Sequence, residues 1–288
     1  MCALAGGPCA AHLTQSPLKI ALVVVYFGQW PPWFPAFVHS CRFNREVDWL
    51  FFTDCVPPSS GAPNMTFIPF SMAEFNDLAT RVLGRPITAW GTYKICDFKP
   101  AYGHLFEEHL AGYDFWGHCD VDIIWGNVRR FITDESLHSH DIISARKNAM
   151  CGHFSLYRNE PRIARLYDRI PNYREMLTWE ECQRLDELHM SSLVEECAAR
   201  GELRVLWSKF LLNFANPKTD SPGLLPPIVD GWFWNRGTLL DLTDGTAGEV
   251  MYLHFMTWKD TLTRCEFGFE DRPESFYISY SHIGFARS

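Results

Sequence analysis

Short apolar runs separated by more polar stretches are the main pattern in this sequence. Residues 20–27 form a continuous, β-branched run followed by Gly28, which is typical of a central strand in a parallel sheet. Similar runs predict further strands at 47–54, 65–68, 113–116, 141–145 and 152–157. The last third holds a Pro/Gly-rich loop at 216–227 and strand-like segments at 203–206, 228–234 and 250–255.

Helices are predicted between several of these strands. We expect them at 33–42, 71–83, 89–98 and 100–109, the last opened by Pro100. The sequence Thr-Trp-Glu-Glu at 178–181 matches a capping box and predicts a helix from there to 199. A strand–helix–strand crossover in the first third implies parallel strands with covering helices. The predicted fold class is therefore α/β, Rossmann-like, with a mostly parallel central sheet flanked by helices.

Length and composition fit one globular domain. The chain has 288 residues, of which 47% are apolar and 15% aromatic, without an internal repeat or an evident linker. We expect a loose N-terminal extension at 1–17 and a single domain at 18–288. A net charge of −8 without a basic stripe argues against a nucleic-acid partner. No apolar run approaches the roughly 20 residues of a membrane span, so no transmembrane segment is expected.

The ten cysteines are scattered, without a Cys-x-x-Cys pair, and several lie inside apolar runs. Disulfide frameworks belong mainly to short secreted chains. Residues 1–17 also lack the basic and apolar regions of a signal peptide. We therefore expect reduced, mostly buried thiols in a cytoplasmic protein.

The most informative chemistry is a pair of carboxylates, Asp120 and Asp122, directly after the predicted strand at 113–116. Residues two apart point the same way if the extended conformation continues. Two carboxylates side by side suit Mg²⁺ or Mn²⁺ that is also bound to a diphosphate, since Mg²⁺ usually takes one or two protein carboxylates plus substrate phosphates. An isolated Asp-x-Asp is common in solvated turns, and its place after a strand favours the metal site.

Two other predicted strand ends carry candidate binding residues, because ligands of open α/β sheets bind at the carboxyl ends of the strands. The first strand ends with Phe27 and Gly28, where glycine permits close approach of a nucleotide. The second ends with Thr53 and Asp54, and Asp54 is placed to accept a hydrogen bond from a ribose or base. An ordinary turn at Gly28 and a capping role for Asp54 fit equally well.

Lys94 and Asp97 precede the strand predicted at 113–116. They are three residues apart and so share a helix face. They are either a solvated ion pair or a pair that contacts a nucleotide.

His254 lies in an apolar strand near the C-terminus, with Lys259 five residues later. It is either a core histidine or a third metal ligand, and an imidazole ligand would favour Mn²⁺.

Asp186 and Glu187 lie in the helix predicted to start at 178. Asp186 falls in the middle of its apolar face, where a carboxylate is costly unless it is paired or faces a cavity. Either the helix breaks there and Asp186 caps a second helix, or Asp186 points into the active site. A catalytic or acceptor-binding role is the functional alternative for this pair.

Residues 20–259 together resemble a glycosyltransferase of the GT-A fold. The similarity is strongest at 93–102, which reads Tyr-Lys-x-x-Asp-Phe-Lys-Pro, and at 115–126, which contains Trp-Gly-x-x-Asp-x-Asp-x-x-x-Gly. Both segments resemble an Asp-x-Asp group of bacterial and viral transferases. The tail from His254 to Lys259 is similar to that of glycogenin-like transferases, although this family spaces its histidine and lysine one residue further apart, with a glycine between them.

The resemblance implies a metal-dependent transfer of a sugar from a UDP- or GDP-sugar donor to the hydroxyl of a glycan or other acceptor. Asp120, Asp122 and His254 would bind Mn²⁺ or Mg²⁺, and Lys259 would contact the diphosphate. The nucleotide side would be formed by Phe27, Gly28, Thr53, Asp54, Lys94 and Asp97. Asp186 or Glu187 would activate the acceptor in an inverting enzyme, whereas in a retaining enzyme the same carboxylate would only stabilise an oxocarbenium-like centre.

Two other functions remain open from the sequence. One is a sugar-binding protein that kept the fold without turnover. The other is a phosphatase of the haloacid dehalogenase type, whose nucleophile also lies in an Asp-x-Asp after a strand. That motif usually follows the first strand, whereas here it lies in the middle of the chain.

Overall fold

The computed structural model describes residues 17–89, 91–146, 148–208, 212–213, 231–243, 247–256 and 258–285. The predicted extension, except for its last residue, and the predicted loop at 216–227 lie outside these ranges. In the described part, a seven-stranded sheet has the order β3-β2-β1-β4-β7-β6-β8. Its strands are β1 Ile20–Tyr26, β2 Val47–Thr53, β3 Met65–Pro69, β4 Phe115–Cys119, β6 Ile142–Ser144, β7 Phe154–Arg158 and β8 Val205–Trp207.

The sheet is mostly parallel, as predicted. Every neighbouring pair from β3 to β4 is parallel, and β7 alone among these strands runs against its neighbours β4 and β6. Residues along β1 alternate between two separate cores, with Ile20 and Leu22 in one and Ala21 and Val23 in the other. This alternation explains the continuous apolar run, because both faces of a central parallel strand are buried.

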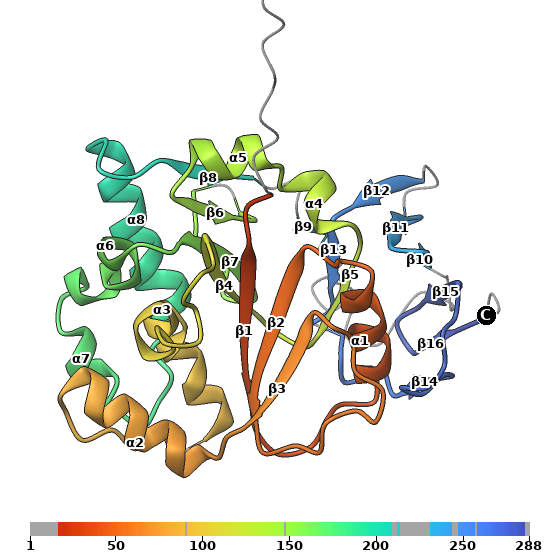
Figure 1. Ribbon diagram of the computed structural model, residues 1–288, viewed down its shortest axis with the longest axis horizontal. Coiled ribbons are helices and arrows are strands. Elements are labelled where there is room, and N and C mark those ends of the chain that lie inside the picture. Colours follow the sequence, from red (N-terminus) through yellow and green to blue (C-terminus); the bar gives the residue numbers. More distant parts are fainter. Residues whose placement is uncertain are drawn as a thin grey trace, which may run out of the picture.

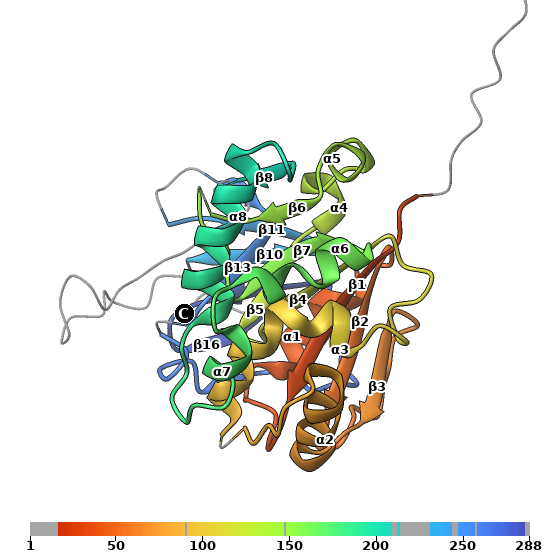
Figure 2. The same ribbon diagram turned by 90° about the vertical axis from the view of Figure 1, so that its left-hand side faces the viewer.

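Helices cover both faces of this sheet, so the predicted fold class is confirmed. The helix α1, Phe34–Arg42, packs on one face and lies between β1–β3 and the C-terminal strands in Figure 1. The opposite face is covered by α2 and α3, with α6, α7 and α8 continuing that layer (Figure 2). The bounds of these helices are α2 Met72–Leu83, α3 Tyr102–Leu105, α6 Pro161–Ala164, α7 Tyr173–Met176 and α8 Met190–Ala199.

Local sequence signals explain the best-predicted helix. The Ser71 hydroxyl accepts a hydrogen bond from the Glu74 N–H while the Glu74 carboxylate accepts one from the Ser71 N–H, and Gly84 ends α2 at a φ of 68°. These interactions satisfy backbone groups at both ends of the helix. The two helices predicted at 89–98 and 100–109 are instead the 3₁₀ helix η1, Thr92–Ala101, followed by α3. Pro100 lies inside η1 and does not open a helix.

The prediction that a helix starts at Thr178 is wrong. The Thr178 hydroxyl donates to the Glu175 carbonyl, and the helical conformation begins only after Arg184, whose φ is 54°. A single π turn, η3 Leu185–His189, then leads into α8. A capping box is a local signal, and here tertiary contacts to the following backbone, described below, prevail over it.

The C-terminal region forms a second, mostly antiparallel layer that the sequence patterns did not predict. A six-stranded sheet in the described residues has the order β12-β11-β10-β15-β16-β14 and a separate aromatic core around Trp232, Trp234 and Trp258. A three-stranded sheet, β5-β13-β9, joins this layer to the Asp-x-Asp segment. The strands are β5 Ile123–Trp125, β9 Leu212–Asn213, β10 Trp232–Asn235, β11 Thr238–Asp241, β12 Gly248–Val250, β13 Tyr252–His254, β14 Arg264–Cys265, β15 Ser275–Ile278 and β16 His282–Gly284.

Short helices complete the described part of the chain: α4 Val128–Phe131, α5 Asp134–Ser139 and η2 Leu166–Arg169. None of the described helices is long and apolar enough to cross a lipid bilayer.

Candidate active site

The carboxyl ends of β1, β2 and β4 lie at the same edge of the large sheet because these strands are parallel. β4 ends at Cys119, so Asp120 and Asp122 follow directly at this edge. The Asp120 N–H donates to the His153 carbonyl at 3.0 Å, and the Asp122 carbonyl accepts from the Phe255 N–H at 3.1 Å. The backbone of the Asp-x-Asp segment is therefore fixed from two sides.

The structure brings the three predicted metal ligands together. One ligand atom each from Asp120, Asp122 and His254 lies within 4.8 Å of the other two. β5 begins directly after Asp122 and pairs antiparallel with β13, which places His254 opposite Ile123. The His254 Nε2 atom lies 3.4 Å from Asp122 Oδ1, and both side chains are buried. A strand pairing between residues more than a hundred positions apart thus completes the cluster.

Two lysines neutralise this pair of carboxylates. Lys259 Nζ lies 3.2 Å from Asp122 Oδ2, and Lys99 Nζ lies 2.5 Å from Asp120 Oδ1. Burial by itself would raise the pKa of Asp122, but hydrogen bonding and charge from His254 and Lys259 outweigh it and hold the pKa well below its usual range. Asp122 is therefore ionised at neutral pH.

The donor set fits a divalent cation. Two carboxylates suit Mg²⁺ or Mn²⁺, and one imidazole nitrogen shifts the preference toward Mn²⁺. A cation bound here would compete with Lys99 and Lys259 for the same carboxylate oxygens. The site is thus balanced in charge without a metal and remains chemically suited to one.

The cluster borders a cavity of about 370 Å³, a size within the range of small-molecule sites, about 300–1,000 Å³. Its charged end is formed by Lys99, Asp120, Asp122 and Lys259. Its apolar walls include Tyr26, Phe27, Trp33, Tyr93, Ile95 and Met256. A ligand with charged groups at one end and a ring system at the other would match this division.

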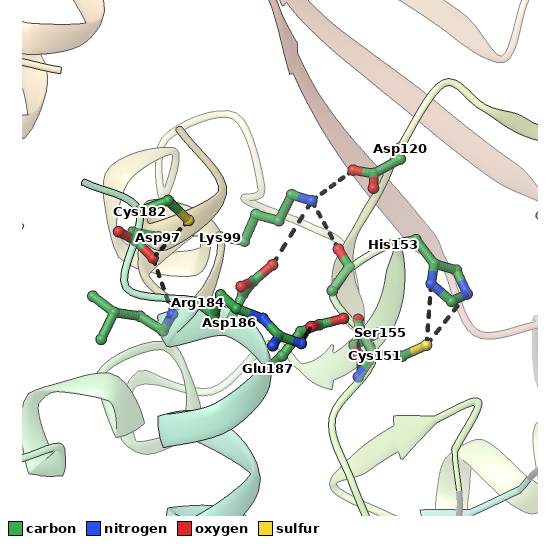
Figure 3. Close-up of polar contacts among 12 residues, drawn as sticks. Asp97, Lys99, Asp120, Cys151, His153, Ser155, Cys182, Arg184, Asp186 and Glu187 are labelled. Atoms are coloured by element: carbon green, nitrogen blue, oxygen red, sulfur yellow. Dashed lines mark hydrogen bonds and ion pairs between the residues drawn. The ribbon is translucent and has the colours of Figure 1, made fainter. Parts of the chain in front are cut away.

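Lys99 connects the metal cluster with the predicted acceptor residues. Besides its ion pair with Asp120, the buried ammonium donates to the Gly152 carbonyl at 2.8 Å and lies 3.9 Å from Asp186 Oδ2 (Figure 3). Burial by itself would lower the pKa of Lys99, but the carboxylate of Asp120 and the other acidic groups around it raise the pKa well above its usual value. Lys99 therefore remains charged between two carboxylates.

Asp186 and Glu187 differ sharply in their surroundings. Burial, reinforced by the charge of Glu187 and opposed by that of Lys99, raises the pKa of Asp186 to about 7. Burial also favours a higher pKa for Glu187, but Arg184, which donates to its carboxylate at 2.5 Å, and Arg146 hold the pKa below its usual value. Neighbouring carboxylates with opposite pKa shifts are typical of sites with divided acid–base roles.

Gly152 allows Asp186 to reach this position. A Cβ atom at residue 152 would lie 2.7 Å from Asp186 Oδ2 and 2.9 Å from Glu187 Cγ. A larger residue would force both side chains to move and would displace the Asp186 carboxylate from Lys99. Asp186 lies within η3 and points toward Lys99, whereas neither Asp186 nor Glu187 lines the cavity beside Asp120. The role of Asp186 at the active site stays a prediction.

Lys94 and Asp97 do not lie where the sequence interpretation placed them. Both side chains are buried, and neither lines the cavity beside Asp120. Lys94 Nζ donates to Asp97 Oδ2 and to the carbonyls of Met176 and Glu181, each at 2.9 Å. The pair is therefore not a solvated ion pair. Lys94 and Asp97 contact other groups of the protein and do not line the cavity in which a nucleotide contact was expected.

Asp97 holds the backbone that leads to Asp186. Its carboxylate accepts from the N–H groups of Gln183 and Leu185, at 2.8 and 3.0 Å. These bonds explain why no continuous helix runs from Thr178, since the N–H groups of residues 183 and 185 bond to Asp97 and not to helix carbonyls. The 3₁₀ helix η1 thus carries Asp97 and Lys99 two residues apart, one fixing the backbone before Asp186 and the other facing its side chain.

The remaining predicted nucleotide residues divide between two places. Phe27 lines the cavity beside Asp120. Gly28 has a φ of 106°, and its N–H donates to Asp54 Oδ1 at 2.8 Å. The Thr53 hydroxyl accepts from the Cys55 N–H, and Thr53 and Asp54 line a neighbouring hollow. The turn conformation at Gly28 and the contact made by Asp54 match the structural alternatives considered for these residues.

A protein-family model matches residues 22–283 and is described as a family of unknown function, DUF6625. The chain belongs to this family. No curated protein matches the chain.

Solved structures of glycosyltransferases show distant similarity. For the galactosyltransferase LgtC in complex with donor and acceptor sugar analogues, the TM-score is 0.41 at 11% identity, over 81% of this chain and 87% of that chain. For the glycosyltransferase GlyE of Streptococcus pneumoniae TIGR4, the TM-score is 0.35 at 11% identity, over 69% of this chain and 47% of that chain. This chain thus spans about half the length of GlyE. The fold class rests on the sheet order and packing described above.

Several residues of the site were not singled out from the sequence. Lys99 lies within the motif that carries Lys94 and Asp97, and its position before Pro100 gave no sign that it would be the one to face Asp120. His153 stacks on the His254 ring with centroids 3.8 Å apart, and its Nε2 atom lies 2.8 Å from the Tyr252 hydroxyl. These contacts fix the orientation of the His254 ring. They depend on β7 and β13 meeting in space, which no local pattern reveals.

Proposed function

We propose that this protein is a metal-dependent glycosyltransferase of the GT-A type. It would transfer a sugar from a nucleotide-diphosphate donor, UDP- or GDP-linked, to an acceptor hydroxyl in glycan or polysaccharide assembly. The observation that carries this proposal is the cluster of Asp120, Asp122 and His254 at the carboxyl edge of a mostly parallel sheet, beside a cavity with one charged end.

On the donor side, Asp120, Asp122 and His254 would hold Mn²⁺ or Mg²⁺. When bound, the cation supplies Lewis-acid stabilisation of the departing diphosphate. Lys259 lies at the same end of the cavity and would add a second positive charge toward that diphosphate. Phe27 and Tyr26 offer apolar surface for the rest of the donor. Gly28, Thr53 and Asp54 would support this wall through the turn that they form.

On the acceptor side, we assign the general base to Asp186. With its pKa near 7, the carboxylate is available at neutral pH and still basic enough to accept a proton. In an inverting transfer, the acceptor oxygen forms the new bond to the sugar carbon, the bond from that carbon to the diphosphate breaks, and the acceptor proton moves to Asp186. Lys99 would orient the carboxylate, and Glu187 would act with Arg146 and Arg184 in holding the acceptor.

The proposal also concerns location. All eight cysteines that the structure describes are free thiols. Free thiols in this number fit a reducing compartment, and we propose the cytoplasm.

The test is a donor screen. Thermal shifts of the protein would be measured with UDP- and GDP-sugars, each with Mn²⁺ and with EDTA, followed by an assay of donor consumption with and without acceptor sugars. We expect one donor to stabilise the protein only in the presence of the cation and to be consumed. A donor that binds without any consumption would support the sugar-binding protein, and the absence of any metal-dependent donor binding would overturn the proposal.

A further inference from the structure

A second large hollow, of about 900 Å³, lies away from the candidate active site. It is bounded by the C-terminal end of α1, the segment leading into β2, residues 61–64, the turn between β10 and β11, and residues 272–274. Asp48 lies at the start of β2, whereas Thr53 lies at its other end, at the carboxyl edge of the large sheet that carries Asp120 and Asp122. Along a strand rising about 3.3 Å per residue, the two ends of β2 are about 20 Å apart.

The hollow is rich in arginine. Arg42, Arg45, Arg236 and Arg272 line it, against two carboxylates, Asp48 and Glu274. Both carboxylates already have partners, because Asp48 accepts a hydrogen bond from the Tyr113 hydroxyl and Glu274 pairs with Arg236 at 2.6 Å. This concentration of positive charge stands out in a chain whose net charge is −8.

Three of the four arginines have no carboxylate partner within the part of the chain that the structure describes. Arg42 is held by carbonyl groups, donating to Phe269 and Ser60. Arg272 donates to the Phe269 carbonyl at 2.7 Å, and Arg45 is exposed on the rim. Burial, together with the nearby charge of Arg272, lowers the pKa of Arg42, although the charge of Glu270 acts in the opposite direction. Like charges held close together favour the binding of an anion between them.

Apolar groups extend the hollow beyond the size of a simple anion. The Phe43 side chain is 44% exposed although its ring packs edge-on against Trp234, with centroids 4.8 Å apart. Pro63 and Pro273 add further apolar surface. A ring of the ligand could lie on Phe43 while its charged group reaches the arginines, and such a combination is typical of small-molecule sites.

We propose that this hollow is a second ligand site, which binds an organic phosphate through Arg45 and Arg272 with the organic part against Phe43. The half-buried guanidinium of Arg42 would form the floor of the site, since carbonyl contacts keep it in place without cancelling its charge. Arg236 would remain paired with Glu274 at the edge. The proposal is independent of the glycosyltransferase function, because no residue of the metal cluster takes part.

Isothermal titration calorimetry in EDTA would test this site on the Asp122→Ala variant, in which the metal cluster is disabled. The probes are glucose 6-phosphate, inorganic phosphate and glucose. We expect saturable binding of glucose 6-phosphate and no binding of glucose. Because each charge-assisted contact to phosphate contributes about tenfold in affinity, Arg45→Ala with Arg272→Ala should weaken binding about 100-fold. Circular dichroism would verify that each variant is folded.

Two further variants sharpen the result. Phe43→Ala should weaken glucose 6-phosphate binding and leave inorganic phosphate unchanged, which separates a phosphorylated organic ligand from the free anion. Arg81→Ala, at an arginine on α2 outside this hollow, should change nothing. If the parent binds neither phosphate probe, or the double arginine variant binds glucose 6-phosphate as tightly as the parent, the site is not an organic-phosphate site.

Discussion

The candidate active site contains two buried aspartates, Asp122 and Asp186, that lie on either side of Lys99 and Asp120 and have opposite pKa shifts. Asp122 contacts Lys259 at 3.2 Å and His254 at 3.4 Å. Among the residues that the structure describes, Asp186 forms an ion pair with Lys99 alone, at 3.9 Å, and Asp120 also shares this lysine. Burial favours the neutral acid in both, so the number and closeness of cationic partners decide the outcome.

This difference divides the site into two sides. On the proposed metal side, made of Asp120, Asp122, His254 and Lys259, the low pKa keeps Asp122 ionised, which suits a metal ligand. On the proposed acceptor side, made of Asp186 and Glu187, the pKa of Asp186 is about 7, which suits a general base. Burial alone therefore does not determine the chemical role of an aspartate, because the charged groups around it set its pKa.

The largest effect is expected from the metal side. Asp122→Ala should abolish metal binding and lower kcat about 10³-fold or more, because the diphosphate loses its Lewis acid. Mn²⁺ binding would be measured by calorimetry, and turnover by release of the nucleoside diphosphate. Asp77→Ala, which removes an exposed carboxylate on α2, is the matched control and should leave both unchanged. Full activity of Asp122→Ala in EDTA would end the metal-dependent interpretation.

A smaller loss is expected from the acceptor side. Asp186→Asn keeps the shape of the side chain and should lower kcat about 10²-fold, the size of lost general-base help. Donor and metal affinities should stay within about twofold, since Asp186 does not touch the metal ligands. Glu187→Gln serves as the comparison and should affect mainly the KM for the acceptor.

If both amide variants weaken binding of UDP or GDP and leave kcat alone, these residues belong to the donor side and the division of the site is incorrect.

Lys99→Met tests the link between the two sides. Lys99 favours the ionised form of Asp186, so its removal should raise the pKa of Asp186 further above 7. A general base acts when deprotonated, and the acid limb of the kcat profile should therefore move to higher pH, with a loss of about tenfold at pH 7. Lys99→Arg keeps the positive charge, so its acid limb should stay close to that of the parent. A profile unchanged in Lys99→Met would show that Lys99 does not influence the base.

The smallest effect concerns stability. The pKa of Asp186 is about 7 in the folded chain and near 3.8 when unfolded, so the folded state binds more protons between these values. The contribution of Asp186 to the free energy of unfolding should therefore fall as the pH rises from about 4 to 7. Asp186→Asn removes this dependence, and its stability relative to the parent should increase by about 1–3 kcal/mol between pH 5 and pH 8. Urea unfolding at the two pH values would measure the change, and a constant difference would contradict the raised pKa.

Much of the large sheet could be predicted from the sequence because its signals are local. The run at 20–27 is apolar at every position since both faces of β1 are buried, and Ser71 with Glu74 caps α2 through bonds within one turn. The Asp-x-Asp pair was likewise visible, because a strand end and two carboxylates two residues apart are read from neighbouring positions. These features specify the α/β class and two of the three residues in the candidate metal cluster.

The tertiary structure decided the rest. His254 reaches Asp122 only because β13 pairs with β5, and the mostly antiparallel C-terminal layer is built from short strands, of which β10 and β15 pair across about forty residues of the chain. Asp97 and Lys99 come from one 3₁₀ helix, yet their partners lie on segments more than eighty and more than twenty residues away. A side chain's charge and reach are encoded locally, whereas its role depends on the groups that folding places within a few ångströms, and long-range strand pairing determines which groups those are.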